Sequence, residues 1–400
     1  MHLRQGGSKF SRKVGIFDTT LRDGEQAPGI QLSPDSKMII ARALEEVGVD
    51  VLEAGFPVNS PSERRSVEMI AKDIQETEIA VLCRPIKEEI DLCHQILRKA
   101  NRSRIHIWIA TSPIHMKYKL NMSPGKVMDK AITAIRHASG KFDTIQFSSE
   151  DATRSDLDFL TNLMREAARA GADVVNLADT VGCALPEHMA LLVGEIRRAV
   201  KDKIPVGVHC HNDLNLATAN TIASIRAGAG QVDVTVTGIG ERAGNTSLEQ
   251  LAVALIFHEK HFGIETGIRP DRLGSVCDTV INEMNLRVGL TQPLIGENAF
   301  RHESGIHVHG MLNNPMTYEL VDPKVLGLLG KKYILGKHTG KAAVKHFLQK
   351  KGCMLPENQI DRLTEMVKER SLETGPLEDE NALVDFALKN GFDINVKEGG

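Results

Sequence analysis

Residues 14–47 read VGIFDTTLRDGEQAPGIQLSPDSKMIIARALEEV, and they contain one complete strand–loop–helix unit. The apolar run at residues 14–17 predicts a strand, and the apolar spacing from Pro34 to Val47 predicts a helix. Ser33 comes directly before Pro34, and a capping residue followed by Pro is a typical helix start. A dense group of polar residues lies between the strand and the helix.

The same unit recurs roughly every 30 residues up to about His261. We expect strands at Val14–Phe17, Val51–Ala54, Ile79–Leu82, Ile105–Ile109, Thr144–Phe147, Val174–Leu177, Val206–His209 and Val232–Val236. We expect helices after them at Pro34–Val47, Glu63–Ile74, Glu88–Lys99, Pro124–His137, Ser155–Ala170, Pro186–Val200, Leu216–Ala227 and Ser247–His258. This pattern favours an α/β fold, a closed parallel (β/α)8 TIM barrel. An open doubly wound sheet stays as the alternative, because strand order is not visible in the sequence.

Three parts of the chain are expected. We expect a flexible N-terminal extension at residues 1–13 and the catalytic barrel at residues 14–265. A small, mainly helical C-terminal appendage is expected at residues 266–400. Within the appendage we expect helices at Asp271–Val288, Lys341–Lys350, Glu357–Arg370 and Asp379–Asn390, with a loop region rich in Gly, Pro, Asn and His at 292–337.

Composition limits the class of partner. The 400 residues hold 49 Lys+Arg against 52 Asp+Glu, for a net charge of −3. This balance gives no reason to expect nucleic acid or an anionic membrane as a partner. No apolar run approaches the ~18 residues of a membrane span, and the basic N-terminus lacks the apolar stretch of a secretory signal. The 6 Cys form no C-x-x-C pair, so we expect a reduced, cytoplasmic protein.

Two strand ends carry candidate metal ligands. In a TIM barrel, catalytic residues lie at the carboxyl ends of the strands. After the first strand, Asp23 can hold a metal ion while Arg22 polarises a substrate carbonyl, although a solvated turn with an ordinary Arg–Asp pair is the alternative. After the seventh strand, His209 and His211 project to one face and are followed by Asn212 and Asp213. This mixed nitrogen and oxygen set suits Zn²⁺, Mn²⁺, Co²⁺ or Fe²⁺, and Mg²⁺ is compatible with it.

The loop at 237–245 follows the eighth expected strand. Gly238, Gly240 and Ala243 match a relaxed dinucleotide fingerprint, but the loop does not open a βαβ unit, so we set that match aside. Loops after strands seven and eight of a barrel commonly bind phosphate. Glycine amides and Arg242 suit a phosphate-bearing cofactor here, and Asn245 can turn its amide oxygen towards the metal.

Other polar residues are less specific. The segments at 147–151 and 176–180 close two further strands, and each on its own is compatible with a helix cap or a turn. Together with the other strand ends they are expected to line one pocket. The segment at 302–310 has three His in nine positions. It is compatible with a second metal site, with a general base that titrates near neutral pH, or with a solvated loop.

Four motifs in order carry a resemblance to a known family. They are Leu21–Gln26 with Lys37, His209–Asp213 with Asn220, Gly238–Asn245, and His302–His307. Over essentially its whole length the chain resembles the family of 2-isopropylmalate, homocitrate and citramalate synthases. It is more distantly similar to hydroxymethylglutaryl-CoA lyase and the 4-hydroxy-2-oxovalerate aldolases.

The resemblance implies a metal-dependent Claisen or aldol-type condensation of acetyl-CoA with a 2-oxo acid, with thioester hydrolysis. It implies that a divalent cation (Mg, Mn, Zn or Co) binds to Asp23, His209, His211 and Asn245. Arg22 stabilises the developing alkoxide, Glu150 positions acetyl-CoA or assists enolisation, and His302 is the general base with Glu303 and Tyr318 beside it. The implied substrate contacts are Arg22, Gln26, His115, Ser148, Asn176 and Thr180, and the implied cofactor contacts are Gly238, Gly240 and Arg242. The appendage is implied to reach into the partner's barrel in a homodimer.

The identity of the acceptor depends on residues outside the four motifs. Homocitrate synthases typically carry an Arg where this chain has Gln146, and an unpaired distal carboxylate in a pocket is costly. The stretches at 55–61 and 110–116 resemble 2-isopropylmalate synthase, so we expect 3-methyl-2-oxobutanoate as the acceptor and a place in leucine biosynthesis. A 2-oxoglutarate, pyruvate or other 2-oxo acid acceptor stays as the alternative, because apolar pockets discriminate weakly.

Two other classes of protein share this fold. Lyases of this fold carry a Cys in the Gly-rich loop, where this chain has Glu241-Arg242-Ala243, so a hydroxyacyl-CoA lyase is disfavoured. A non-catalytic binding protein on an inherited barrel is the remaining rival, since a fold alone does not establish activity. The chain also departs from the family at Asn215, where Gly is usual.

Overall fold

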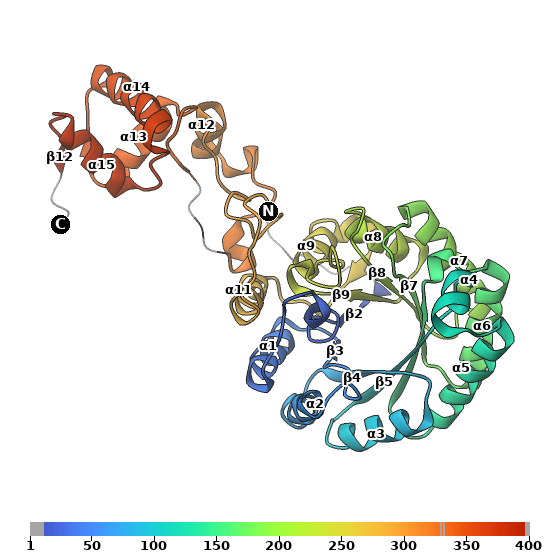
Figure 1. Ribbon diagram of the computed structural model, residues 1–400. Coiled ribbons are helices and arrows are strands. Elements are labelled where there is room, and N and C mark those ends of the chain that lie inside the picture. The colour runs from blue at the N-terminus through green and yellow to red at the C-terminus, as the bar shows by residue number, and fades with distance from the viewer. Residues whose placement is uncertain (1–11, 329, 331–332, 397–400) are drawn as a thin grey trace. The chain divides into compact units, whose positions relative to one another are not determined.

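The computed structural model in Figure 1 describes residues 12–396 except 329, 331 and 332. The chain divides after Arg287 into two compact units. The first unit contains the barrel and the second contains the later helices.

Eight parallel strands form a closed barrel in the first unit (Figure 1). They are β2 (Gly15–Asp18), β3 (Val51–Glu53), β4 (Glu78–Cys83), β5 (Ser103–Ala110), β6 (Thr144–Glu150), β7 (Val174–Asp179), β8 (Val206–Cys210) and β9 (Gln231–Val234). Each strand pairs with the next in sequence, and β9 pairs with β2 in parallel to close the ring. The (β/α)8 prediction is therefore confirmed, and the doubly wound alternative is excluded.

Helices follow the strands around the outside of the barrel. They are α1 (Pro34–Val47), α2 (Pro61–Asp73), α3 (Lys87–Leu97), α4 (Pro113–His115), α5 (Pro124–Ala138), α6 (Leu157–Ala170), α7 (Pro186–Val200), α8 (Ala217–Ala227), α9 (Leu248–Phe257) and α10 (Glu259–Phe262). The side chains of Ser33, Ser60 and Ser123 accept hydrogen bonds from the first turns of α1, α2 and α5, each of which begins with Pro. These caps explain why the helix starts could be read from the sequence.

The edges of the barrel unit differ from the expected boundaries. Arg12 and Lys13 form β1, which pairs in parallel with β10 (Ile264–Glu265), so they do not belong to an extension. Residues 1–11 lie outside the described residues. At the other end, α11 (Leu273–Glu283) packs against α1 and extends this unit beyond residue 265 to Arg287.

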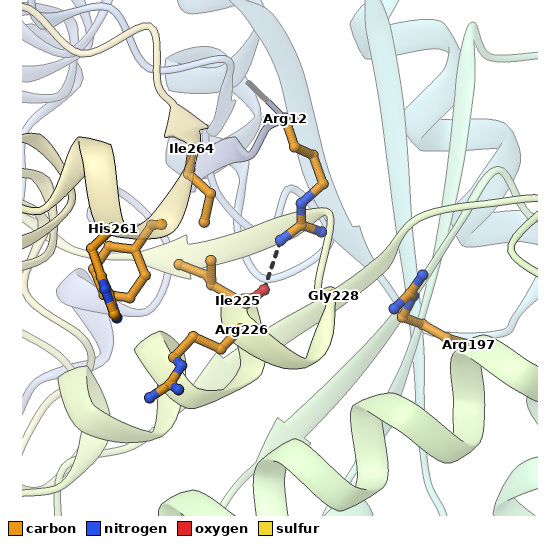
Figure 2. Close-up of a pocket in the computed structure, with 8 residues that line it drawn as sticks. Arg12, Arg197, Ile225, Arg226, Gly228, His261 and Ile264 are labelled. Atoms are coloured by element: carbon orange, nitrogen blue, oxygen red, sulfur yellow. Dashed lines mark hydrogen bonds between the residues drawn. The ribbon is translucent and has the colours of Figure 1, made fainter. Parts of the chain in front are cut away.

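A basic pocket of about 480 Å³ lies at the amino-terminal end of the strands, where α7 and α8 end. Figure 2 shows Arg12 donating to the carbonyl oxygen of Ile225, at 2.6 Å. Arg12 also donates to Ala229, and Arg197 donates to Ala227, at 2.9 and 3.0 Å. The two guanidinium groups therefore satisfy the last carbonyls of α8, where the helix dipole favours a positive charge. This pocket is at the opposite end of the barrel from the carboxyl ends of the strands.

The second unit is mainly helical. It contains α12 (Gly305–Asn313), α13 (Lys341–Lys350), α14 (Glu357–Thr374), α15 (Glu380–Lys389) and the short strands β11 (Cys353–Met354) and β12 (Asn395–Val396). Its own core includes Val308, Val344, Phe347, Leu363 and Leu383. In the part of the chain that the structure describes, no helix is both long and apolar enough to cross a membrane.

Candidate metal and substrate site

Three predicted metal ligands converge at the carboxyl ends of β2 and β8. His209 Nε2 lies 3.2 Å from His211 Nε2 and 3.2 Å from Asp23 Oδ2, and His211 Nε2 lies 3.8 Å from the same carboxylate oxygen. For ligand distances of about 2.1 Å, the ligand atoms around one ion lie roughly 3.0–3.4 Å apart. Two of the three separations fall in this range and the third is slightly longer, so the trio is close to the spacing that one divalent cation needs.

Asn245, the fourth predicted ligand, lies beside this group. Its backbone pairs with that of His211 in an isolated antiparallel bridge, and both polar atoms of its side-chain amide are buried without a hydrogen bond among the described residues. A Cβ on Gly240 would lie 2.7 Å from the Asn245 nitrogen and 3.0 Å from Asp23 Oδ1, so only glycine lets the loop approach this closely. A buried amide with no partner costs free energy, and a bound cation would give its oxygen a partner. The residues present thus fit a metal ion.

The neighbouring charges and the burial of the site shift the pKa values of its three residues. Burial alone would raise the pKa of Asp23, but Arg22 and the two histidines hold it well below its usual range. Burial works against the charged form of His209, yet Asp23 and Asp233 raise its pKa to about 9. Burial and the neighbouring His209 lower the pKa of His211 to about 4. The trio therefore combines one negative carboxylate with two imidazoles that do not readily both hold a proton. A bound cation would supply the positive charge in place of a second proton.

Arg22 is held beside the trio by a residue that the sequence analysis missed. Its Nε donates to Glu53 at 2.6 Å, and its Nη1 donates to Asp23 at 2.9 Å and to Gln26 at 3.2 Å. Glu53 at the end of β3 is fully buried. Burial opposes its ionisation, but Arg22 and His106 lower the pKa of Glu53 to about 2. Arg22 is thereby fixed in direction, and its Nη2 makes no hydrogen bond within the described residues.

Glu53 has a second partner, His106, which extends these contacts to the next strands of the barrel. His106 on β5 lies between Glu53 and Ser148, with Nδ1 2.6 Å from Glu53 and Nε2 2.5 Å from the Ser148 hydroxyl. His106 was also missed. A sequence feature that could have indicated it is a polar residue inside an apolar strand. A strand buried on both faces tolerates such a group only when it has a hydrogen-bond or charge partner.

Glu150 lies at the end of β6. Its Oε1 accepts from Lys119 at 2.5 Å and lies 3.5 Å from His115 Nδ1, while Oε2 is buried with no hydrogen bond in the described chain. Lys119 lies on a π-helical turn, Met116–Leu120, and its ammonium is 4.9 Å from the Trp108 ring centroid. Such turns are frequent at functional sites. The predicted residues Glu150 and His115 are thus brought together.

The loops after β7 and β8 are tied to each other. Arg242 donates to both carboxylate oxygens of Asp213 at 2.8 Å and to the Thr180 carbonyl at 2.7 Å. The Thr180 hydroxyl accepts from the Asp151 amide at 2.8 Å. Asn215 has a φ of +59°, a left-handed conformation that Asn tolerates better than most residues, which explains how it replaces the usual Gly. Arg242 therefore holds a loop in place in addition to any contact with a phosphate.

Asn176 is buried inside the barrel and donates to Asp233 at 2.9 Å. Asp233 on β9 also lies 3.3 Å from His209 Nδ1. Asp233 is not among the residues predicted from the sequence, although a carboxylate within the run at 231–236 carries the same signal as His106. Gly238 has a φ of +73°, and its carbonyl accepts from the Asn245 amide, so it shapes the turn that delivers Asn245.

In the second unit, the predicted base lies in a cluster of rings. The His302 ring centroid is 6.1 Å from that of His307 and 6.1 Å from that of Tyr318, and His307 is 4.4 Å from Tyr318. Glu303 accepts from the backbone amide of His338 at 2.9 Å. His302 and Tyr318 are therefore brought together, while Glu303 is used to hold the segment at 336–339.

Comparisons with known proteins show which family the chain belongs to. The HMGL-like family matches residues 13–280, and a domain described as homocitrate synthase post-HMGL domain-like matches residues 294–374. The 2-isopropylmalate synthase of Pyrococcus furiosus is 45% identical over 362 residues, which is 90% of this chain and 72% of that protein. The 2-isopropylmalate synthase of Halothermothrix orenii is 43% identical over 353 residues, 88% of this chain and 68% of that protein.

Solved structures show the same fold at lower identity. The hydroxymethylglutaryl-CoA lyase from Pseudomonas aeruginosa has a TM-score of 0.60 and 19% identity, over 70% of this chain and 94% of that one. The HMG-CoA lyase from Brucella melitensis has a TM-score of 0.60 and 19% identity, over 69% of this chain and 100% of that one. At this identity the likeness concerns the barrel fold alone.

The fold and the site define a TIM-barrel protein with an Asp-His-His group at the carboxyl ends of its strands. Within that class, the chain belongs to the HMGL-like family, among the 2-isopropylmalate synthases and their relatives. The resemblance drawn from the four motifs is thereby confirmed.

Proposed function

We propose that the protein is an acyltransferase that condenses acetyl-CoA with a 2-oxo acid and hydrolyses the thioester. The acceptor we propose is 3-methyl-2-oxobutanoate, which makes the reaction that of 2-isopropylmalate synthase in leucine biosynthesis. The observation that carries the proposal is the convergence of Asp23, His209 and His211 beside Arg22. The relatives at 41–45% identity named 2-isopropylmalate synthase support it.

Asp23, His209, His211 and Asn245 would hold the divalent cation, which is Mg, Mn, Zn or Co in this proposal. When bound, the cation supplies Lewis acidity towards the keto oxygen of the acceptor. Arg22 points a guanidinium at the same region, and its contacts with Glu53 and Asp23 hold it still. A preorganised donor of this kind stabilises the alkoxide that forms when the new carbon–carbon bond is made.

Acetyl-CoA must lose a proton from its methyl group before it attacks the acceptor. Glu150 has a buried oxygen that lacks a partner among the described residues and is available to the acetyl group. His302, with Glu303 and Tyr318 near it in the second unit, is the proposed base. Gly238, Gly240 and Arg242 are the proposed contacts for the cofactor. The proposed acceptor contacts are Arg22, Gln26, His115, Ser148, Asn176 and Thr180.

Gln146 favours a monocarboxylic acceptor. It is fully buried and accepts from Arg104 at 2.9 Å, and Arg104 is paired with Glu78 at 2.7 Å. The charge of Arg104 is therefore already neutralised. A second carboxylate, such as the distal one of 2-oxoglutarate, would enter this region without a free positive charge to meet it. This observation supports 3-methyl-2-oxobutanoate over 2-oxoglutarate.

The test measures CoA thiol release from acetyl-CoA with a panel of acceptors, with and without EDTA. The panel contains 3-methyl-2-oxobutanoate, pyruvate, 2-oxoglutarate and an oxo acid with a phosphonate. We expect release with 3-methyl-2-oxobutanoate that stops in EDTA and returns with metal. Preferred turnover of 2-oxoglutarate or pyruvate would move the assignment to a homocitrate or citramalate synthase. Release with no acceptor would contradict the synthase proposal and direct the assay to hydroxyacyl-CoA cleavage.

The proposal includes a homodimer in the cytoplasm. In it, the second unit of one subunit supplies His302 to the barrel of its partner. Both statements are predictions from the family resemblance, and the subunit arrangement is tested by the complementation experiment in the Discussion.

A further inference from the structure

The barrel interior contains an unusual number of polar side chains. Arg104, Gln146, Asn176, Gln231 and Asp233 are each at least nine-tenths buried. Barrel interiors are normally filled by bulky apolar residues in layers. Buried ionic groups often add no stability over apolar residues of similar volume, so their presence here calls for another explanation.

These side chains form one continuous chain of contacts. Glu78 accepts from Arg104 at 2.7 Å, and Arg104 donates to Gln231 Oε1 at 2.6 Å. Gln231 Nε2 then donates to Asp233 Oδ1 at 3.2 Å. The other oxygen of Asp233 lies 3.3 Å from His209 Nδ1, so the chain ends on a metal ligand.

The strand order shows how far this chain reaches. β5, which carries Arg104, and β9, which carries Gln231, are four strands apart in a ring of eight, so Arg104 spans the barrel interior. The register sets His209 directly beside Asp233. Gly207 on β8 makes room, because a Cβ there would lie 2.5 Å from Asn176 Oδ1 and 3.3 Å from Gln231 Nε2. A glycine inside a strand often marks such a close approach.

Three nitrogen atoms surround the carboxylate of Asp233. Asn176 and Gln231 donate to it at 2.9 and 3.2 Å, and His209 Nδ1 faces it. A carboxylate accepts from all three, whereas an amide has one accepting oxygen and would turn its NH₂ towards a donor. With Nδ1–H held by Asp233, His209 presents Nε2 to the position shared with Asp23 and His211.

We propose that Asp233, held in place by Gln231 and Arg104, is a positioning residue that orients the His209 imidazole for metal binding. The proposal rests on the metal site of the proposed function. It adds that the interior polar contacts, which start at the amino-terminal end of the strands, affect how tightly that site binds a metal ion. A carboxylate behind a ligating imidazole fixes its tautomer and ring orientation.

The experiment uses the full chain and measures the affinity for Zn²⁺ or Co²⁺ by competition with a chelator, together with the visible absorption of bound Co²⁺. Asp233→Asn is expected to weaken metal binding by roughly 10–100-fold, the usual effect of losing such a partner, and to change the Co²⁺ spectrum. Gln231→Leu keeps the size and the neutral charge but breaks the link to Arg104. It is expected to weaken binding in the same direction by a smaller factor, and it carries the test if Asp233→Asn does not fold.

Ser224→Ala is the matched control. Ser224 is fully buried and donates to the carbonyl oxygen of Asn220, and among the described residues its hydroxyl makes no hydrogen bond with the interior polar side chains. It is expected to leave metal affinity and the Co²⁺ spectrum unchanged. Unchanged affinity and spectrum in Asp233→Asn and Gln231→Leu would overturn the positioning role while leaving the metal site intact. His209→Ala separates the two ideas. If it binds metal as tightly as the wild type, the proposed metal site is wrong and this inference falls with it.

Discussion

His211 is the proposed metal ligand of the trio whose side chain has the fewest partners of its own. Its Nδ1 is buried without a hydrogen bond among the described residues, and its Nε2 faces Asp23 and His209. His211→Ala is expected to reduce metal affinity and metal-dependent CoA release to the detection limit while the protein stays folded. His137→Ala is the control, because His137 lies on α5 and pairs with Asp91 outside the site. Full CoA release by His211→Ala in EDTA would contradict the metal site.

Asp18 is expected to make the stability of the protein depend on pH. It is fully buried at the end of β2, and burial, with Glu53 nearby, raises its pKa to about 7. In the unfolded chain its pKa is near the usual 3.8. Between these values the folded state holds a proton that the unfolded state has lost, so this group makes stability fall as pH rises from about 4 to about 7.

Asp18→Asn is expected to remove that slope. The amide oxygen can still accept from the Thr20 backbone, at the 2.8 Å contact that Asp18 makes. The variant should therefore gain stability relative to the wild type at pH 8 by a few kcal/mol, and by much less at pH 4. Urea unfolding at the two pH values measures this. An equal difference between the two proteins at both pH values would show that Asp18 does not titrate in this range.

At the scale of single elements, Lys37 on α1 holds the first loop. It is fully buried, donates to the Leu21 carbonyl at 3.1 Å, and pairs with Glu25 at 2.6 Å and Glu63 at 2.7 Å. Glu63 lies on α2, so one ammonium joins two helices to the loop that carries Arg22 and Asp23. Removing it leaves carboxylates partly buried without their partner.

Lys37→Met is expected to cost about 3–5 kcal/mol of unfolding free energy, as measured by urea titration. The control is Arg42→Met. Arg42 on α1 pairs with Asp73 on α2 at 2.7 Å, but both side chains are exposed, so it should cost below about 1 kcal/mol. Equal losses in the two variants would show that the buried pair does not hold the loop.

The elements also show what could be predicted from the sequence. The α1 helix has the bounds expected from its apolar spacing and its Ser–Pro start, because local signals determine them. The metal trio could be predicted because strand ends meet at one face of a barrel. Glu53, His106 and Asp233 could not be placed, because their partners lie on other strands and the register that joins them is invisible in one sequence. The π-helical turn at Met116–Leu120 had no sequence signal of its own.

At the scale of the whole molecule, the proposal distributes the reaction over the two units. The barrel holds the metal ligands, and the second unit holds His302 in its cluster with His307 and Tyr318. If His302 is the general base, His302→Ala should lower kcat by ~10²–10⁴ and leave metal affinity and acceptor KM nearly unchanged. An unchanged kcat would remove His302 from the mechanism.

Mixing variants tests whether the two units act across subunits. His211→Ala lacks a complete barrel site and His302→Ala lacks the base, so each homodimer is expected to be nearly inactive. In a mixed dimer whose second unit serves the partner's barrel, one site combines an intact barrel with an intact second unit. Equal amounts of the two, unfolded together and refolded, would form mixed dimers as half of the total. One of the two sites in each would be complete, so about a quarter of wild-type activity should return. Activity no greater than the sum of the separate variants would show that each barrel uses the second unit of its own chain.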